Sequence, residues 1–412
     1  MTDPIYLTAR EAATELNVSR ATLYAYVSRG LIRSEASENG RNRLYRAEDV
    51  RALRARKTPR KAQDNIARES LSFGAPVMDS AVTLIADGKF YYRGRDVGEL
   101  ARSARFEQVA TLLWKQDGAD PFAQPPLEIP LPTGMAPLPR AISLLSIAGE
   151  QDLKGLKLTE RGVAETGARI IRLLTASFCK IPVTTAPIHE RFAEAWGLNE
   201  AGADLIRTAL ILAADHKLNA SAFTVRCVAS TRATPYGAIN AGLCALHGPR
   251  HGGQTAQAIA LIDEISAAPS ASDAVMARLK RGERLPGFGM PLYTALDPRA
   301  TAILSRMEEN FGWIPALDLA HDIIQAARDA VGLGPNIDFA LATMCRALSL
   351  PEAGPFAVFA TGRSAGWLPH AQEQYASPEL IRPRARYFGD ELQSGTPLTA
   401  ADATSRVGDR AP

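Results

Sequence analysis

The chain has 412 residues, of which 46% are hydrophobic and 22% are charged. This composition is typical of a globular protein with a large core, and it excludes disordered, collagen-like and disulfide-rich chains. The four cysteines lie far apart without a C-x-x-C pair, and no apolar run approaches the roughly 20 residues of a membrane helix. Because the first residues also lack the pattern of a secretory signal, we expect a cytoplasmic protein with no membrane partner.

The net charge of +3 is unevenly distributed along the chain. Residues 1–61 contain thirteen Lys and Arg against seven Asp and Glu, a net charge of +6, so the remainder carries −3. An excess of basic residues at one end indicates a polyanionic partner such as nucleic acid. On charge alone, a solvated basic tail is the simpler interpretation.

Two short helices are predicted at the start of the chain. Thr8 is followed three residues later by Glu11, which is the pattern of a capping box, and residues 12–16 continue an apolar stripe. Ser19 has the pattern of a second helix cap, and this helix is predicted to end at Gly30. Two short helices joined by a tight turn form a helix-turn-helix.

A wing is predicted after the second helix, with strands at residues 31–33 and 43–46 around a turn at Gly40, and a further helix begins at Ala47. This order resembles the winged helix-turn-helix of MerR-type and excisionase-type proteins over about residues 5–57. The pieces that carry the resemblance are L-T-A-R-E-A-A, V-S-R-A-T-L-Y, S-R-G-L-I-R and L-Y-R-A-E-D-V.

The resemblance implies duplex DNA as a partner, with the second helix in the major groove and the wing on the phosphates. The groove residues would be Arg20, Thr22 and Tyr26, and the phosphate residues would be Arg41, Arg43 and Arg46. A small protein-binding domain on the same fold is the alternative.

The pattern divides the chain into segments. Residues 1–60 form the predicted DNA-binding domain, residues 61–70 a polar linker, residues 71–395 a large domain and residues 396–412 a polar tail. Seven prolines between Asp120 and Arg140 predict a surface loop inside the large domain.

The large domain is predicted to be mainly α-helical. Apolar residues recur at helical spacing from Phe106 to Trp114 and from Leu317 to Val331, whereas residues 82–92 predict a small β-hairpin. No glycine-rich phosphate loop opens a helix, so nucleotide binding of that kind is not indicated. We therefore expect an all-α body with bundle-like packing.

All six histidines follow residue 185, and two of them lie in unusual surroundings. His216 follows an apolar helix in D-H-K-L-N, and His251 lies in the glycine-rich sequence H-G-P-R-H-G-G. Gly248 and Pro249 break the helix that would aim His247 and His251 at one metal ion, which argues against zinc. Taken alone, each histidine is more often a structural residue than a catalyst.

Nine sequence blocks occur in the order found in citrate synthases, and together they span about residues 70–390. They are Y-R-G-R-D-V-G-E-L-A (92–101), D-H-K-L-N-A-S (215–221), V-A-S-T (228–231), H-G-P-R-H-G-G (247–253), P-G-F-G-M-P-L-Y (286–293), D-P-R (297–299), N-I-D-F (336–339), G-R-S-A-G-W (362–367) and R-P-R-A-R-Y-F-G (382–389). The chain is therefore similar to citrate synthases. The resemblance implies large and small helical domains, the latter at about 254–358, and a homodimer or higher oligomer.

The resemblance also implies a Claisen-type condensation of acetyl-CoA, or another short acyl-CoA, with oxaloacetate, without a permanently bound cofactor. By motif match, Asp338 is the base that deprotonates the acyl carbon and His251 stabilises the thioester enolate. The expected oxo-acid ligands are His216, Arg299, Arg363 and Arg382, the last entering from a neighbouring subunit, and Gly287, Phe288 and Gly289 are assigned to the acyl-CoA. Arginine suits this role because its planar fork pairs with carboxylates.

Two positions depart from the family pattern. Met290 occupies the place of the histidine that polarises the ketone, and a thioether has no proton to donate. Loss of one such donor typically costs about 10²–10³ in turnover. Lys217 replaces the usual glutamate after the first histidine and adds a positive charge.

Two classes of function follow from these observations. The first is an acyl-CoA condensing enzyme, weakened at Met290 and fused to a DNA-binding domain. The second is a non-catalytic sensor, in which an acyl-CoA or a dicarboxylate alters DNA binding. The enzyme is favoured by the number of residues that match the family's catalytic and substrate-binding positions.

Overall fold

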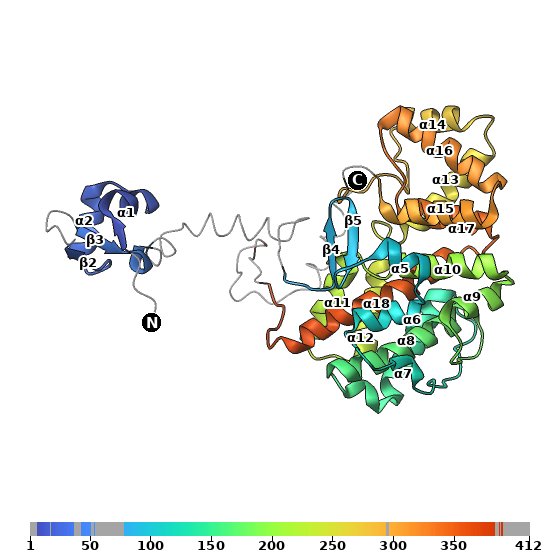
Figure 1. The fold of residues 1–412 in the computed structure, drawn as a ribbon, viewed down its shortest axis with the longest axis horizontal. Helices are drawn as coiled ribbons and strands as arrows, with labels where there is room; N and C mark the ends of the chain where they lie inside the picture. The colour runs from blue at the N-terminus through green and yellow to red at the C-terminus, as the bar shows by residue number, and fades with distance from the viewer. Residues whose placement is uncertain are drawn as a thin grey trace, which may run out of the picture. The chain divides into compact units, whose positions relative to one another are not determined.

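The computed structural model describes residues 6–16, 18–36, 43–50, 53, 78–293, 296–383, 387 and 389. By its internal contacts the chain divides into two compact units, Met1–Asp79 and Ser80–Pro412. We call them the N-terminal unit and the helical body and describe each by itself (Figure 1).

The N-terminal unit combines two helices with a three-stranded antiparallel sheet of order β1-β3-β2. Its elements are β1 (Tyr6–Thr8), α1 (Ala9–Glu15), α2 (Arg20–Ser28), β2 (Ser34–Ala36) and β3 (Arg43–Arg46), and residues 47–50 are helical. A small core that includes Leu23, Ile32, Tyr45 and Val50 holds these elements together.

Both predicted helix caps are present in this unit. Thr8 and Glu11 form a capping box, in which the Thr8 backbone N–H donates to the Glu11 carboxylate (2.8 Å) and the Glu11 N–H donates to the Thr8 hydroxyl (3.3 Å). Ser19 accepts a hydrogen bond from the Thr22 N–H (3.2 Å). These side chains satisfy helix donors that would otherwise lack partners.

The predicted wing needs correction. Its first strand lies at Ser34–Ala36 and not at residues 31–33, and β1 adds a strand that was not predicted. Residues 31–33 do not form a strand because Ile32 is drawn into the core and Arg33 forms a two-point ion pair with Asp49 (2.7 and 2.9 Å). Gly40, the predicted turn residue, lies outside the described residues.

The helical body is mainly α-helical, as predicted. Its helices are α5 (Val97–Ser103), α6 (Phe106–Leu113), η1 (Pro121–Ala123), α7 (Pro137–Gln151), η2 (Leu153–Leu156), α8 (Glu160–Cys179), α9 (Ile188–Trp196), α10 (Glu200–Ala213), α11 (Ala220–Ser230), α12 (Pro235–Leu246), α13 (Gln254–Ser266), α14 (Ala271–Lys280), α15 (Pro298–Phe311), α16 (Pro315–Val331), α17 (Ile337–Ala347) and α18 (Gly354–Ala376). Helices α13–α17 form one group, and in the rest of the body α6, α8, α10, α11 and α12 pack against α18 (Figure 1).

The predicted hairpin is confirmed as β4 (Thr83–Ala86) and β5 (Lys89–Tyr92), extended by the short β6 (Arg95–Asp96). Asp87 and Gly88 connect β4 and β5, with φ angles of 50° and 73°. Positive φ at both central residues is the requirement of a type I′ turn, which Asp-Gly meets at low cost. The hairpin therefore follows from local sequence.

Helix α18 lies at the centre of the body and packs against α8, α10, α11 and α12. Pro369 inside this helix has no N–H, and the Trp114 indole N–H donates to the carbonyl of Ala365, four residues earlier, at 2.8 Å. A long-range side chain thereby bonds a carbonyl that the helix leaves without its usual partner.

Two smaller expectations have mixed outcomes. The proline-rich stretch is largely an irregular loop inside the large domain, but Pro121 and Phe122 of η1 are buried and α7 already begins at Pro137. In α16, Leu317, Ala320 and Ala327 are buried, but Val331 is 42% exposed because it is the last residue of the helix. Within the described ranges, no helix is long and apolar enough to cross a membrane.

Candidate active site

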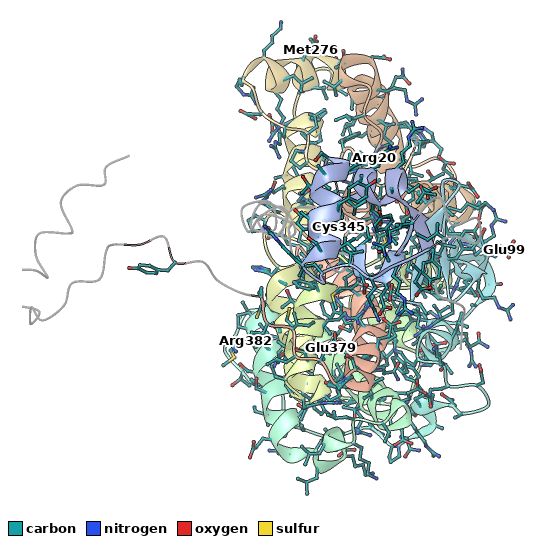
Figure 2. All side chains as sticks on the ribbon, turned by 90° about the vertical axis from the view of Figure 1, so that its left-hand side faces the viewer. Arg20, Glu99, Met276, Cys345, Glu379 and Arg382 are labelled. Atoms are coloured by element: carbon teal, nitrogen blue, oxygen red, sulfur yellow. The ribbon has the colours of Figure 1, made fainter. Side chains whose placement is uncertain are left out.

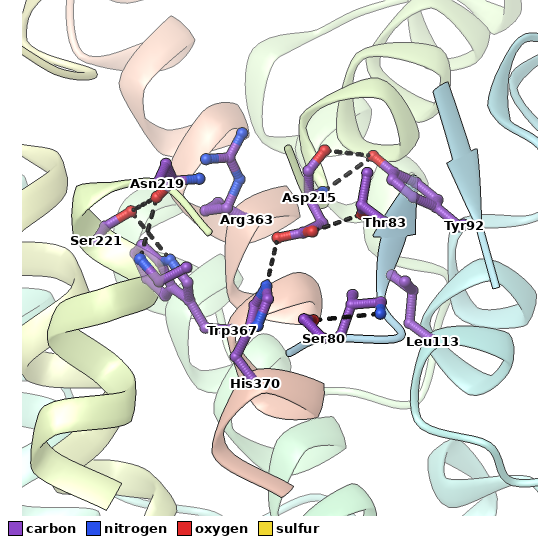
Figure 3. A network of polar contacts seen from close by, with 12 residues as sticks. Ser80, Thr83, Tyr92, Leu113, Asp215, Asn219, Ser221, Arg363, Trp367 and His370 are labelled. Carbon is purple, nitrogen blue, oxygen red and sulfur yellow. Dashed lines mark hydrogen bonds and ion pairs between the residues drawn. The ribbon is translucent and has the colours of Figure 1, made fainter. Parts of the chain in front are cut away.

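His216 lies just after α10, on a turn fixed by its buried neighbour Asp215. The Tyr92 hydroxyl bonds the backbone N–H and carbonyl of Asp215, and the Asp215 carboxylate accepts hydrogen bonds from Thr83 (2.5 Å) and pairs with His370 (3.2 Å). Figure 3 shows this network between the hairpin and α18. The network sets the path of the backbone and hence the position of His216.

The His216 ring is buried, and its Nε2 lies 2.8 Å from the Tyr293 hydroxyl. Burial, followed by the positive charges of Arg299 and Arg363, holds the pKa of His216 well below its usual value. The ring is therefore neutral near pH 7 and has one N–H to donate.

Arg363 reaches the same region from α18. Gly362 and Gly366 allow this helix to approach α10 closely, since a Cβ on Gly366 would collide with the Ala214 carbonyl oxygen. The Arg363 Nε donates to the Ala213 carbonyl (2.7 Å), whereas its buried Nη2 has no hydrogen-bond partner among the described residues. Burial lowers the pKa of Arg363 to about 10. A buried guanidinium with an unused donor points to an anionic ligand.

Arg299 is held by a buried two-point ion pair at the start of α15. Its Nε and Nη2 donate to the Asp297 carboxylate at 2.9 and 2.7 Å, and Asp297 also caps this helix. Burial lowers the pKa of Arg299, but the Asp297 charge and hydrogen bonds outweigh it and the net shift is upward. Arg299 is therefore a fixed cation.

Asp338 occupies the first turn of α17, which Asn336 caps. The Thr255 hydroxyl donates to one oxygen of its carboxylate at 2.5 Å. Burial raises the pKa of Asp338 to about 6, even though the Thr255 hydrogen bond and the charge of Arg299 act in the opposite direction. A carboxylate with a raised pKa in a buried site is suited to general base catalysis.

His251 lies in the glycine-rich turn before α13, where its Nε2 is 2.8 Å from the Ser221 hydroxyl. The Trp367 indole N–H donates to the same hydroxyl (3.1 Å), and this hydroxyl donates to Asn219 Oδ1 (2.7 Å; Figure 3). Burial, then the charges of Arg363 and Arg299, lowers the pKa of His251 to about 4. This histidine is also neutral at pH 7.

The loop at residues 286–293 carries Met290 and is fixed by glycine. Gly287 has a φ of 85°, and a Cβ there would lie 2.8 Å from that of Phe339. The Gly287 and Gly289 backbones exchange hydrogen bonds with residues 334–336. Phe288 is buried against Phe339, with ring centroids 4.7 Å apart. Its side chain thus belongs to the core, so only the loop backbone remains for the acyl-CoA assignment.

The structure brings most of the predicted residues together. The charges of Arg299 and Arg363 act on His216, His251 and Asp338 alike. Arg382, by contrast, is exposed on the surface of the body after α18 (Figure 2). Among the described residues, no group of three or more His, Cys, Asp or Glu side chains is arranged to hold a metal ion.

Sequence reasoning gave no role to Thr255, Tyr293 and Asp297, which contact Asp338, His216 and Arg299. Asp297 carried a local signal, since Asp before Pro is a helix start. Thr255 and Tyr293 carried none, because their partners are 83 and 77 residues away in sequence.

In the N-terminal unit, the side chains of Arg20 and Arg43 are exposed and that of Thr22 is half-buried. The Arg46 Nη2 lies 3.8 Å from the Glu35 Oε1. Arg10 and Arg20 line a hollow of about 480 Å³ between α1 and α2. Arg41 lies outside the described residues.

Tyr26, predicted to face the major groove, is half-buried and packs against the small core. Tyr24, on the same helix, is 52% exposed. The exposed tyrosine of α2 is therefore Tyr24.

Comparison with known proteins agrees with this architecture. Residues 127–384 match the family model "Citrate synthase, C-terminal domain", and residues 6–58 match "Helix-turn-helix domain". The chain is 31% identical over 368 residues to citrate synthase 2 of Bacillus subtilis, covering 79% of this chain and 97% of that protein. It is 34% identical over 204 residues to a citrate synthase of Haloferax volcanii, covering 48% and 54%.

The chain therefore belongs to the citrate synthase family and carries an additional helix-turn-helix domain at its N-terminus. Solved structures support the same fold. The citrate synthase of Thermotoga maritima matches with a TM-score of 0.66 at 24% identity, covering 79% of this chain and 96% of that one. The citrate synthase of Thermoplasma acidophilum matches with a TM-score of 0.67 at 24% identity, covering 80% and 98%.

Proposed function

We propose that the helical body condenses acetyl-CoA, or another short acyl-CoA, with oxaloacetate, and that the N-terminal unit binds duplex DNA. One observation carries the catalytic part. The charges of the buried Arg299 and Arg363 act on a buried carboxylate whose pKa is raised and on two histidines that are neutral at pH 7. Residues 254–358 act as the small domain of residues 71–395, and residues 1–60 as the DNA-binding domain. The proposal places the protein in the cytoplasm, where DNA and acyl-CoA are both accessible.

Asp338 is the base that removes a proton from the acyl carbon. Its pKa of about 6 leaves it ionised at pH 7 but basic enough for the task, and the Thr255 hydrogen bond orients it. Asn336 caps α17 and fixes the turn that presents the carboxylate.

His251 donates a hydrogen bond to the thioester oxygen as the enolate forms. A neutral imidazole has one proton, so Nδ1–H is available only if Nε2 accepts from Ser221. In the structure the single proton of the Ser221 hydroxyl is donated to Asn219 Oδ1 (2.7 Å). For His251 to act as the donor to the thioester, this hydroxyl must instead turn its proton to His251 Nε2, 2.8 Å away.

Arg299 and Arg363 bind the carboxylates of the oxo-dicarboxylate, and His216 acts on the same ligand through the Tyr293 hydroxyl that it contacts. The unused Nη2 of buried Arg363 supports this role, since an anion would complete its hydrogen bonds. Water then hydrolyses the condensed thioester to give the tricarboxylate and free CoA thiol. The solved Thermoplasma acidophilum enzyme, of the same fold, is a ternary complex with carboxymethyl coenzyme A and oxaloacetate.

A homodimer or higher oligomer is part of the proposal. Leu153 and Leu156 in η2 are 75% and 64% exposed, and Ile147 in α7 and Met135 just before α7 are 37% and 43% exposed. Exposed apolar side chains of this kind are suited to contact with a second copy. Arg382, exposed after α18, would then complete a site in the neighbouring subunit.

Met290 favours a second candidate, a non-catalytic sensor of citrate or acyl-CoA that regulates transcription. The proposed site retains the base Asp338 and the arginines that bind the oxo acid, but residue 290 of its loop cannot donate a hydrogen bond to the ketone. The test is release of free CoA thiol from acetyl-CoA and oxaloacetate by wild type, Met290→His and, as control, Met276→His on α14, a partly exposed methionine.

For an enzyme that lacks one donor, we expect measurable wild-type turnover and a gain of up to about 10²–10³ in Met290→His. Met276→His should change nothing. If wild type and Met290→His are both inactive while oxaloacetate still binds, the sensor is the better description.

A further inference from the structure

The position of Tyr293 bears on the donor that is missing at Met290. Tyr293 lies three residues after Met290 on the same loop, and its N–H donates to the Met290 carbonyl (3.2 Å). Its side chain is 9% exposed and turns to His216, with the hydroxyl 2.8 Å from Nε2 and the ring centroids 5.6 Å apart. The loop therefore brings a phenol to the oxo-acid histidine.

The surroundings keep this phenol protonated. Burial raises the pKa of the Tyr293 hydroxyl, an effect that the charge of Arg299 only partly offsets. His216 is neutral for the reasons given above and holds a single proton. The pair thus has two protons, one on the phenol and one on the imidazole.

An oxo-dicarboxylate presents only hydrogen-bond acceptors, so the arrangement of these two protons determines which group can donate to it. If His216 Nε2–H donates to the Tyr293 oxygen, the Tyr293 O–H is free to donate to the ligand. If the phenol donates to Nε2 instead, the proton of the neutral His216 lies on Nδ1. Only the first arrangement therefore gives the ligand a donor on Tyr293.

We propose that Tyr293, backed by His216, donates the hydrogen bond to the ketone oxygen of the oxo acid that Met290 cannot supply. The inference rests on the proposed function, because it concerns the same site. In the condensation, the enolate carbon forms the new C–C bond and the ketone π pair moves to oxygen. The Tyr293 O–H stabilises the charge that develops there.

The experiment compares oxaloacetate with succinate, which has the same two carboxylates but no ketone oxygen. Binding of each is measured by calorimetry on the full chain for wild type, Tyr293→Phe and Tyr375→Phe. The control removes another buried phenol, whose hydroxyl bonds the Ala233 carbonyl (2.6 Å). Melting temperatures establish that each variant is folded.

We expect wild type to prefer oxaloacetate, Tyr293→Phe to lose about tenfold in oxaloacetate affinity with succinate unchanged, and Tyr375→Phe to keep the preference. Adding Met290→His to Tyr293→Phe should restore the preference. An equal loss for both ligands, or no loss, overturns the role of Tyr293.

The outcomes also separate this inference from the proposed function. If wild type binds oxaloacetate but releases no thiol, the catalytic proposal fails, while a selective loss in Tyr293→Phe still supports the contact. If wild type binds neither dicarboxylate at millimolar concentration, both are wrong.

Discussion

In the N-terminal unit, Arg20 and Arg43 stand in solvent, whereas in the helical body Arg299 and Arg363 are 2% and 1% exposed. The exposed arginines keep their rotational freedom. The buried pair is fixed, Arg299 by the Asp297 carboxylate and Arg363 by the Ala213 carbonyl.

This difference separates two ways of binding anions. Exposed arginines neutralise phosphates at many positions and are screened by salt. Buried arginines have already lost their hydration during folding, so they recognise a small carboxylate of one shape and charge. We therefore expect substitutions in the body to act on one ligand strongly and substitutions in the N-terminal unit to act on DNA weakly and additively.

The largest effect is expected for Asp338→Asn. The amide cannot accept the acyl carbon's proton, so thiol release should fall by about 10²–10⁴. Asp329→Asn, which changes an exposed carboxylate on α16, should leave the rate within about twofold. An active Asp338→Asn protein would show that another group is the base.

Arg363→Ala should weaken oxaloacetate binding by about 10–10², because a hydrogen bond to a charged group contributes about 1.5–3 kcal/mol. Calorimetry measures the loss, and Arg95→Ala, in an exposed position of the hairpin, is the matched control. Equal affinity in wild type and Arg363→Ala would remove this arginine from the ligand site.

A smaller effect is expected in the pH profile. Because Asp338 acts ionised and its pKa is raised to about 6, kcat/KM should fall as the pH drops through 6. Thr255→Val removes a hydrogen bond that lowers this pKa and should therefore move the acidic limb of the kcat/KM profile to higher pH. A limb that stays in place in Thr255→Val would argue against Asp338 as the group that titrates.

The smallest effects are expected on DNA. Arg20→Ala and Arg43→Ala should each weaken duplex binding a few-fold and reduce the slope of log affinity against log salt by about 0.9 for each phosphate that is no longer neutralised. A chain that begins near Ser70 should lose the binding, whereas Arg95→Ala should retain it. Equal DNA retention by the full and shortened chains would contradict a role for the N-terminal unit.

Much of the fold could be predicted from the sequence because its signals are local. The Thr8–Glu11 capping box, the Ser19 cap and the Asp87-Gly88 turn depend on residues within a few positions of one another. The nine blocks also identified the family. The strand shift at residues 31–33 could not be predicted, because the burial of Ile32 and the Arg33–Asp49 ion pair are tertiary contacts.

The sequence by itself thus determined the helical class, the added helix-turn-helix and the types of residue available for chemistry. Tertiary structure decided the protonation states of these residues, since a pKa depends on burial and on charges that are distant in the sequence. Arg363 donates to a carbonyl 150 residues away, and Tyr293 meets His216 across 77 residues. Only the packing of α18 against α10, and of the Met290 loop against His216, turns these separate side chains into one site.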